Sequence, residues 1–125
     1  MKKIFQIILI MGGGLLMNSC YYDEIPERVI IELPTDPGDP GYVEIEFVAD
    51  IQPIFTASCI SCHDDSRSPD LRAGNSYNAL VPEYVIANDA AASRLYNQLA
   101  GGHRSLADDK ITLIQTWINQ GAKNN

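Results

Sequence analysis

One short motif limits what this chain can fold around. Cys59, Cys62 and His63 form a Cys-x-x-Cys-His motif, in which two thiols stand three positions apart and an imidazole follows directly. Two thiols at this spacing can add across the two vinyl groups of one porphyrin, and the adjacent imidazole can bind its iron from one face. The motif therefore predicts one covalently bound haem c, attached through Cys59 and Cys62 and ligated by His63.

Other uses of the two cysteines are a local disulfide, half of a zinc site or a disulfide-exchange motif. A structural zinc ion normally takes four Cys or His ligands at suitable spacing. Besides the pair, residues 20–125 offer only Cys20, His63 and His103. A disulfide-exchange motif would leave His63 without a role. The haem interpretation is favoured because it gives both thiols and the imidazole of His63 a role.

The N-terminal segment indicates export. Lys2 and Lys3 precede an apolar stretch from Ile4 to Leu16, and small or polar residues then lead to Cys20. This order of charged, apolar and cleavage regions is typical of a secretory signal. The apolar stretch is shorter than the roughly 20 residues of a membrane span. Residues 1–19 are therefore predicted to be a signal peptide.

The cysteine that ends this segment resembles the lipobox cysteine of bacterial lipoproteins, although Met17 replaces the usual Leu. The resemblance implies that Cys20 takes the lipid, becomes the first mature residue and anchors the chain to a membrane. An ordinary signal peptide and an uncleaved anchor are the alternatives. Asp23 and Glu24 resemble an acidic export signal. We expect an exported outer-membrane lipoprotein that faces the periplasm or the cell surface.

The mature chain is predicted to consist of a tether and one small domain. Four prolines within residues 20–42 disfavour a sustained helix or a central strand, so this acidic segment is expected to be a disordered tether. The composition then changes, and residues 43–125 are long enough for one domain. Removing the two lysines of the signal segment takes the formal net charge from −7 to −9. So acidic a chain is a poor binder of nucleic acid.

Three helices are predicted from apolar residues that recur at helical spacing. The first follows an extended lead-in at residues 43–47, takes Asp50 as its N-cap and ends at the Cys-x-x-Cys-His motif. Its apolar face comprises Ile51, Ile54 and Phe55. The second is expected over residues 90–100 and ends at Gly101 and Gly102.

The third helix has the clearest pattern. Ser105 and Asp108 fit a capping box, and Gly121 is expected to end the helix. Its apolar stripe comprises Ile111, Ile114, Trp117 and Ile118. Trp117 and the stripe are predicted to be core residues. Residues 66–82 are predicted to be mostly loop.

Residues 47–122 resemble class I cytochrome c domains and, more narrowly, the small single-haem c-type lipoproteins of Bacteroidetes and Planctomycetes. The matching stretches are DIQPIF at 50–55, CISCH at 59–63, ASRLY at 92–96 and WINQGA at 117–122. The resemblance implies an all-α, small cytochrome c-like fold, with about three helices around one covalently bound haem. The porphyrin would add apolar surface that a loop-rich domain of about 80 residues lacks.

The chain departs from class I domains at the second axial ligand, which in that family is usually a Met. All three methionines lie within the signal segment. The only other histidine besides His63 is His103, in the loop where the Met is expected. We therefore predict bis-His ligation of the iron by His63 and His103. The alternative is a solvated His103 and an open sixth site.

The predicted function is electron transfer between redox proteins of the cell envelope, by an electron carrier and not an enzyme. The alternative is a haem enzyme or sensor whose open sixth site binds peroxide or a diatomic gas. A third interpretation is an interaction lipoprotein in which the motif is unused. Arg104, next to His103, is the expected partner of a haem propionate.

Overall fold

The computed structural model describes residues 32–125, and within this range the chain is helical and has no strand. In chain order the elements are a π-helical turn η1 (Phe47–Ile51), α2 (Gln52–Ser58), α3 (Ser76–Leu80), α4 (Arg94–Ala100), a 3-10 turn η2 (His103–Ser105) and α5 (Asp108–Asn119). The all-α prediction is therefore confirmed for the described residues.

The predicted signal peptide, Cys20 and the first part of the predicted tether lie outside the described residues. No described helix is long and apolar enough to cross a membrane.

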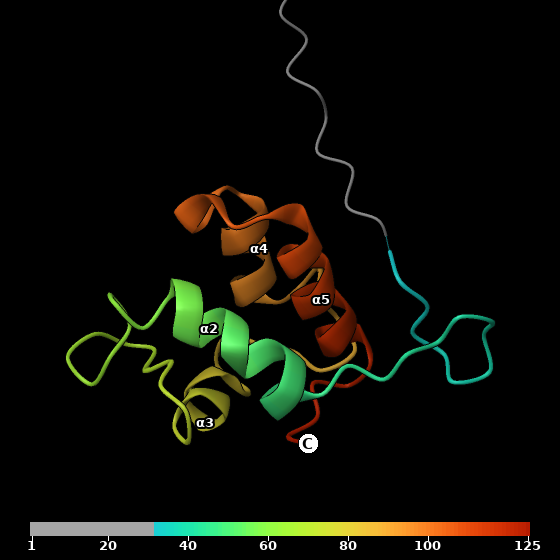
Figure 1. The fold of residues 1–125 in the computed structure, drawn as a ribbon, viewed down its shortest axis with the longest axis horizontal. Coiled ribbons are helices and arrows are strands. Elements are labelled where there is room, and N and C mark those ends of the chain that lie inside the picture. The colour runs from blue at the N-terminus through green and yellow to red at the C-terminus, as the bar shows by residue number, and fades with distance from the viewer. Residues whose placement is uncertain (1–31) are drawn as a thin grey trace, which may run out of the picture.

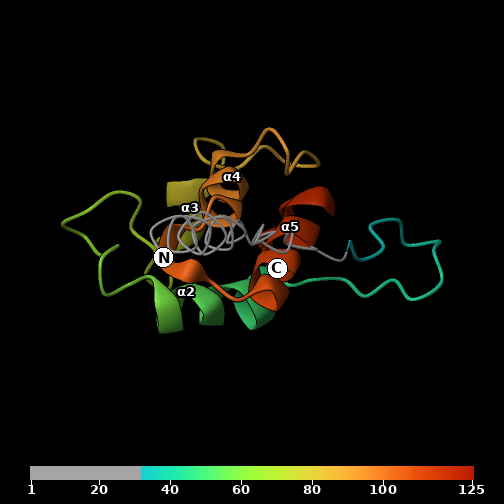
Figure 2. The ribbon, with the colours of Figure 1, turned by 90° about the horizontal axis from the view of Figure 1, so that it is seen from above.

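The helices are arranged so that α4 faces α2 and α3 across the molecule, while α5 runs along one side (Figure 1). Residues 32–42 contain no helix or strand and form a turn in which the Gly38 N–H donates to Asp36 Oδ1 at 2.9 Å. This segment projects from one end of the molecule, and the loop that follows α2 projects from the opposite end (Figure 2).

The first helix begins earlier than predicted. Phe47, expected in an extended lead-in, starts η1, and Asp50 lies within the helical run instead of at its N-cap. The Asp50 carboxylate accepts a hydrogen bond from the Glu46 N–H at 2.8 Å. Asn125 accepts hydrogen bonds from the N–H groups of Phe47 and Val48 at 3.0 and 2.9 Å. These contacts satisfy N–H groups that a helix N-terminus leaves without intrahelical partners.

The other two predicted helices also begin at different residues. The helix expected from residue 90 begins at Arg94, because the buried Ser93 hydroxyl donates to the Asp89 carbonyl at 2.7 Å and accepts from the Ile86 N–H at 2.9 Å. These bonds hold the preceding residues in turns. The N-cap of α5 is Ala107, so Ser105 is not the N-cap residue that the predicted capping box places there.

A short helix, α3, lies within the segment predicted to be loop. The Ser76 hydroxyl donates to Gln52 Oε1, and Gln52 Nε2 donates to the Leu71 carbonyl at 3.1 Å. These buried polar groups satisfy one another between α2 and α3, as buried polar groups generally do. Because α3 has only five residues and buries a single large apolar side chain, Leu80, it leaves no periodic pattern in the sequence.

The core joins the first and last helices around an aromatic cluster. The ring of Phe47 lies 5.2 Å from that of Trp117 and 5.3 Å from that of Tyr77, between centroids. The Trp117 indole N–H donates to the Lys123 carbonyl at 2.9 Å. Trp117 is fully buried, as are Ile111, Ile114 and Ile118. The prediction that this stripe belongs to the core is confirmed.

Replacing Trp117 with Ala is expected to lower the free energy of unfolding by about 3–5 kcal/mol, the usual cost of truncating a buried aromatic side chain. The substitution removes the ring that packs on Phe47 and leaves the Lys123 carbonyl without its indole donor. Urea denaturation followed by circular dichroism measures the change. Val48→Ala is the control, since Val48 is 65% exposed and should change stability by less than about 0.5 kcal/mol. Equal effects of the two substitutions would contradict this placement of Trp117.

Candidate cofactor site

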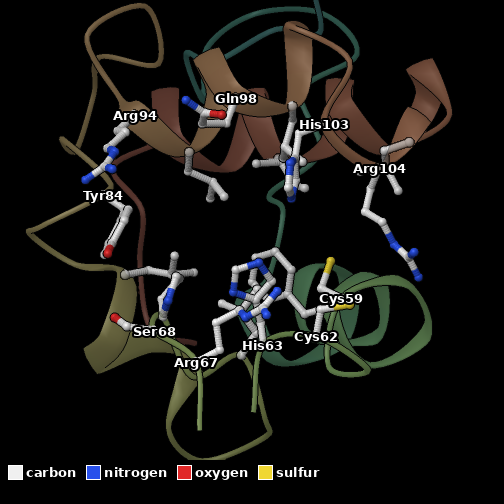
Figure 3. Close-up of a pocket in the computed structure, with 18 residues that line it drawn as sticks. Cys59, Cys62, His63, Arg67, Ser68, Tyr84, Arg94, Gln98, His103 and Arg104 are labelled. Carbon is white, nitrogen blue, oxygen red and sulfur yellow. The ribbon is translucent and has the colours of Figure 1, made fainter. Parts of the chain in front are cut away.

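The Cys-x-x-Cys-His motif forms the turn that follows α2. The Cys59 N–H donates to the Phe55 carbonyl at 2.8 Å, and the His63 N–H donates to the Cys59 carbonyl at 3.0 Å. Helix-like hydrogen bonds therefore continue through the motif. Residues three apart on a helical turn share one face, which brings the thiols of Cys59 and Cys62 together (Figure 3). Both cysteines are free thiols.

A cavity of about 360 Å³ opens beside this turn, between α2 and α3 on one side and α4 with η2 on the other (Figure 3). Pockets for small molecules and cofactors occupy about 300–1,000 Å³ and are mainly apolar. The apolar side chains of this cavity belong to Phe55, Leu71, Leu80, Leu95, Leu99, Leu106 and Ile114. The cavity is also lined by Cys59, Cys62, His63 and His103, so the four predicted haem residues meet in one place.

His63 and His103 face one another across the cavity. Their ring centroids are 6.2 Å apart and their planes are inclined at 68°. With a metal–nitrogen bond of about 2.0 Å on each side, two imidazoles that bind one metal ion from opposite faces have centroids about 6 Å apart. The Nδ1 atom of His63 is buried and has no hydrogen-bond partner among the described residues. The spacing of the two rings therefore suits a single metal ion between them.

The loop that contains His103 has left-handed backbone conformations and forms hydrogen bonds to the end of α2. Gly102, Arg104 and Ser105 have φ angles of 91°, 65° and 46°, and such left-handed conformations cost about 1–3 kcal/mol at a non-glycine residue. The Arg104 guanidinium donates to the Ser58 carbonyl at 3.1 Å and to the Ser61 hydroxyl at 3.4 Å. These bonds join the His103 loop to the end of α2 and hold His103 opposite the motif.

The two thiols differ in their surroundings. Cys59 is half-buried and Cys62 is exposed. Burial raises the pKa of the Cys59 thiol, and the nearby positive charge of Arg104 partly opposes this effect. Since the thiolate is the form that oxidises and binds metals, burial keeps Cys59 in its less reactive protonated form.

The described residues do not form a metal site without a cofactor. Within residues 32–125, no group of three or more His, Cys, Asp or Glu side chains lies close enough to hold a metal ion. The two thiols and two imidazoles line one cavity.

The cavity also contains polar residues that the motif did not single out. Arg67, Ser68, Tyr84, Arg94 and Gln98 all line it. Arg94 and Gln98 are four positions apart on α4, so they share one face of that helix. The sequence signal that could have identified Arg94 and Gln98 is their spacing of four positions. Leu95 and Leu99 have the same spacing and also line the cavity.

Comparisons with protein-family models, with curated proteins and with solved structures found no match for this chain. Function is therefore inferred from the residues of the cavity and their geometry.

Proposed function

We propose that this chain is a single-haem c-type cytochrome lipoprotein with a class I cytochrome c-like fold, which carries electrons between redox proteins of the cell envelope. The observation that supports it best is the 6.2 Å separation of two imidazoles across an apolar cavity that both thiols of a Cys-x-x-Cys-His motif also line. The lining residues fit the group in polarity and in ligand chemistry. A haem bound there supplies reversible one-electron chemistry.

Each residue of the site has a defined role in this proposal. Cys59 and Cys62 attach the porphyrin through thioether bonds. His63 and His103 bind the iron from opposite faces, and Arg104 holds the His103 loop in place through the Ser58 carbonyl. The apolar side chains of the wall exclude water from the porphyrin faces. Cys20 anchors the protein to a membrane, and the tether lets the domain reach its redox partners.

Ligation of the iron by both His63 and His103 would favour an electron carrier over a haem enzyme or sensor. Such a haem would leave no coordination site for peroxide or a diatomic gas. Bis-His ligation also gives a lower reduction potential than His–Met ligation, because Met as an axial ligand raises the haem potential. The expected partners are therefore redox proteins of lower potential than those that serve a Met-ligated relative.

The proposal is tested with mature protein produced together with haem attachment machinery. We expect the mass of one haem on the peptide that contains Cys59 and Cys62, and a low-spin visible spectrum without the long-wavelength band of a Met–iron bond.

The angle of 68° between the two imidazole planes leads to a second expectation. Ligand planes that approach a right angle leave two iron d orbitals nearly equal in energy. Electron paramagnetic resonance should then show one highly anisotropic low-spin signal.

Three results would count against different parts of the proposal. Absence of the haem mass would remove the cytochrome function altogether. A Met–iron band would exclude His103 as the ligand. A rhombic low-spin signal with three well-separated g values would mean that the two imidazole planes lie nearly parallel, contrary to the geometry of this cavity.

A further inference from the structure

The cavity wall is cationic although the chain is acidic. The sequence has a formal net charge of −7, with 16 Asp and Glu residues against 9 Lys and Arg residues. Three arginines, Arg67, Arg94 and Arg104, nevertheless line the cavity, and no Asp or Glu of the described residues does. A cavity that is apolar inside and cationic at its edges suits a flat apolar ligand that carries negative charge.

Two of these arginines are available for such a ligand. Neither Arg67 nor Arg94 forms an ion pair with another described residue. Outside the cavity, Arg72 and Lys123 each bind a carboxylate, at 2.8 and 2.6 Å. The Arg94 guanidinium lies 5.0 Å from the centre of the Tyr84 ring, a cation–π contact that limits its freedom while leaving its N–H donors unused.

The thiols determine where the negative charge of a bound haem must lie. The vinyl groups that Cys59 and Cys62 attack are on one half of the porphyrin, and its two propionates project from the opposite edge. In Figure 3 these cysteines and Arg104 lie on one side of the cavity, and Arg94 and Tyr84 lie on the other, with the two imidazoles between. A haem attached to these thiols therefore directs its propionates towards Arg94.

We infer that Arg94, supported by the Tyr84 ring, binds a haem propionate at the end of the cavity opposite Cys59 and Cys62. This inference rests on the proposed function. Arg104, which we expected to fill this role, lies beside the cysteines and donates to Ser58 and Ser61 instead. Charge-assisted pairing of a guanidinium with a carboxylate is among the strongest hydrogen bonds in proteins, so Arg94 would fix the tilt of the porphyrin in the cavity.

The test compares Arg94→Gln with Arg104→Gln in the mature haem-loaded chain, because both substitutions remove one cavity cation. Resonance Raman spectroscopy reports the propionate bending mode, and a redox titration reports the midpoint potential. We expect Arg94→Gln to keep the covalent haem, to move the propionate band to lower wavenumber and to make the potential more negative. Arg94→Lys should retain most of the wild-type potential, and Arg104→Gln should leave the propionate band unchanged.

The outcomes separate this inference from the proposed function. A wild-type chain without covalent haem would refute the proposed function itself. A propionate band that moves in Arg104→Gln but not in Arg94→Gln, or that moves in neither, would overturn the role of Arg94. If Arg94→Gln does not accumulate, Tyr84→Leu removes the ring beneath the guanidinium and should move the band in the same direction; an unchanged band in that variant would equally overturn the inference.

Discussion

Replacing Cys59 and Cys62 together with Ser is expected to eliminate covalently bound haem. A serine hydroxyl is close in size to the thiol that it replaces, but it does not form the thioether bonds that attach a porphyrin. Under denaturing conditions that extract free haem, the double variant should retain none, and its mass should equal that of the polypeptide. The pyridine haemochrome of the extracted protein measures the same loss.

The single variants and a neighbouring substitution make this prediction specific. Cys59→Ser and Cys62→Ser should each retain at most one thioether link and a reduced yield of haem. Ser61→Ala lies between the two cysteines and should keep full haem content, since its exposed hydroxyl contributes only long contacts to Cys62 and Arg104, at 3.9 and 3.4 Å. Haem that survives extraction in the double variant would exclude these thiols as the attachment points.

Local sequence patterns predicted the parts of the molecule that depend on local interactions. The motif residues Cys59, Cys62 and His63 lie on one helical turn, so their spacing alone places them together. The stripe that includes Trp117 has the period of a helix and is buried as expected. His103 was selected by composition, because residues 20–125 contain no Met and no histidine besides His63 and His103.

Contacts between distant residues explain what the patterns did not predict. The early start of the first helix depends on Asn125, which is 78 positions from Phe47. The helix α3 depends on Ser76 bonding to Gln52, which is 24 positions earlier. The Arg94–Tyr84 pair joins residues ten positions apart, across the turns that precede α4. The first two pairs lie too far apart for a local window, and the third is not at helical spacing, so all three become visible only in three dimensions.

Replacing His103 with Ala is expected to open one axial position of the haem. The loss of the second imidazole leaves His63 as the one imidazole at the iron, because the described residues that line the cavity include no further His and no Met. The oxidised protein should change from mainly low-spin to mainly high-spin, as its visible spectrum will report. Carbon monoxide should bind the reduced variant at once, whereas the wild-type protein should bind it slowly or not at all.

Rescue and control experiments decide whether His103 acts as a ligand or only as part of the loop. Added imidazole should restore the low-spin spectrum of His103→Ala, and His103→Met should produce the long-wavelength Met–iron band. Gln98→Ala changes another residue of the same wall and should leave the spin state unchanged.

A His103→Ala variant that stays low-spin would assign the sixth position to a different ligand. A wild-type protein that is already high-spin and binds carbon monoxide at once would favour the haem enzyme or sensor, because His103 would then leave the iron open to substrate.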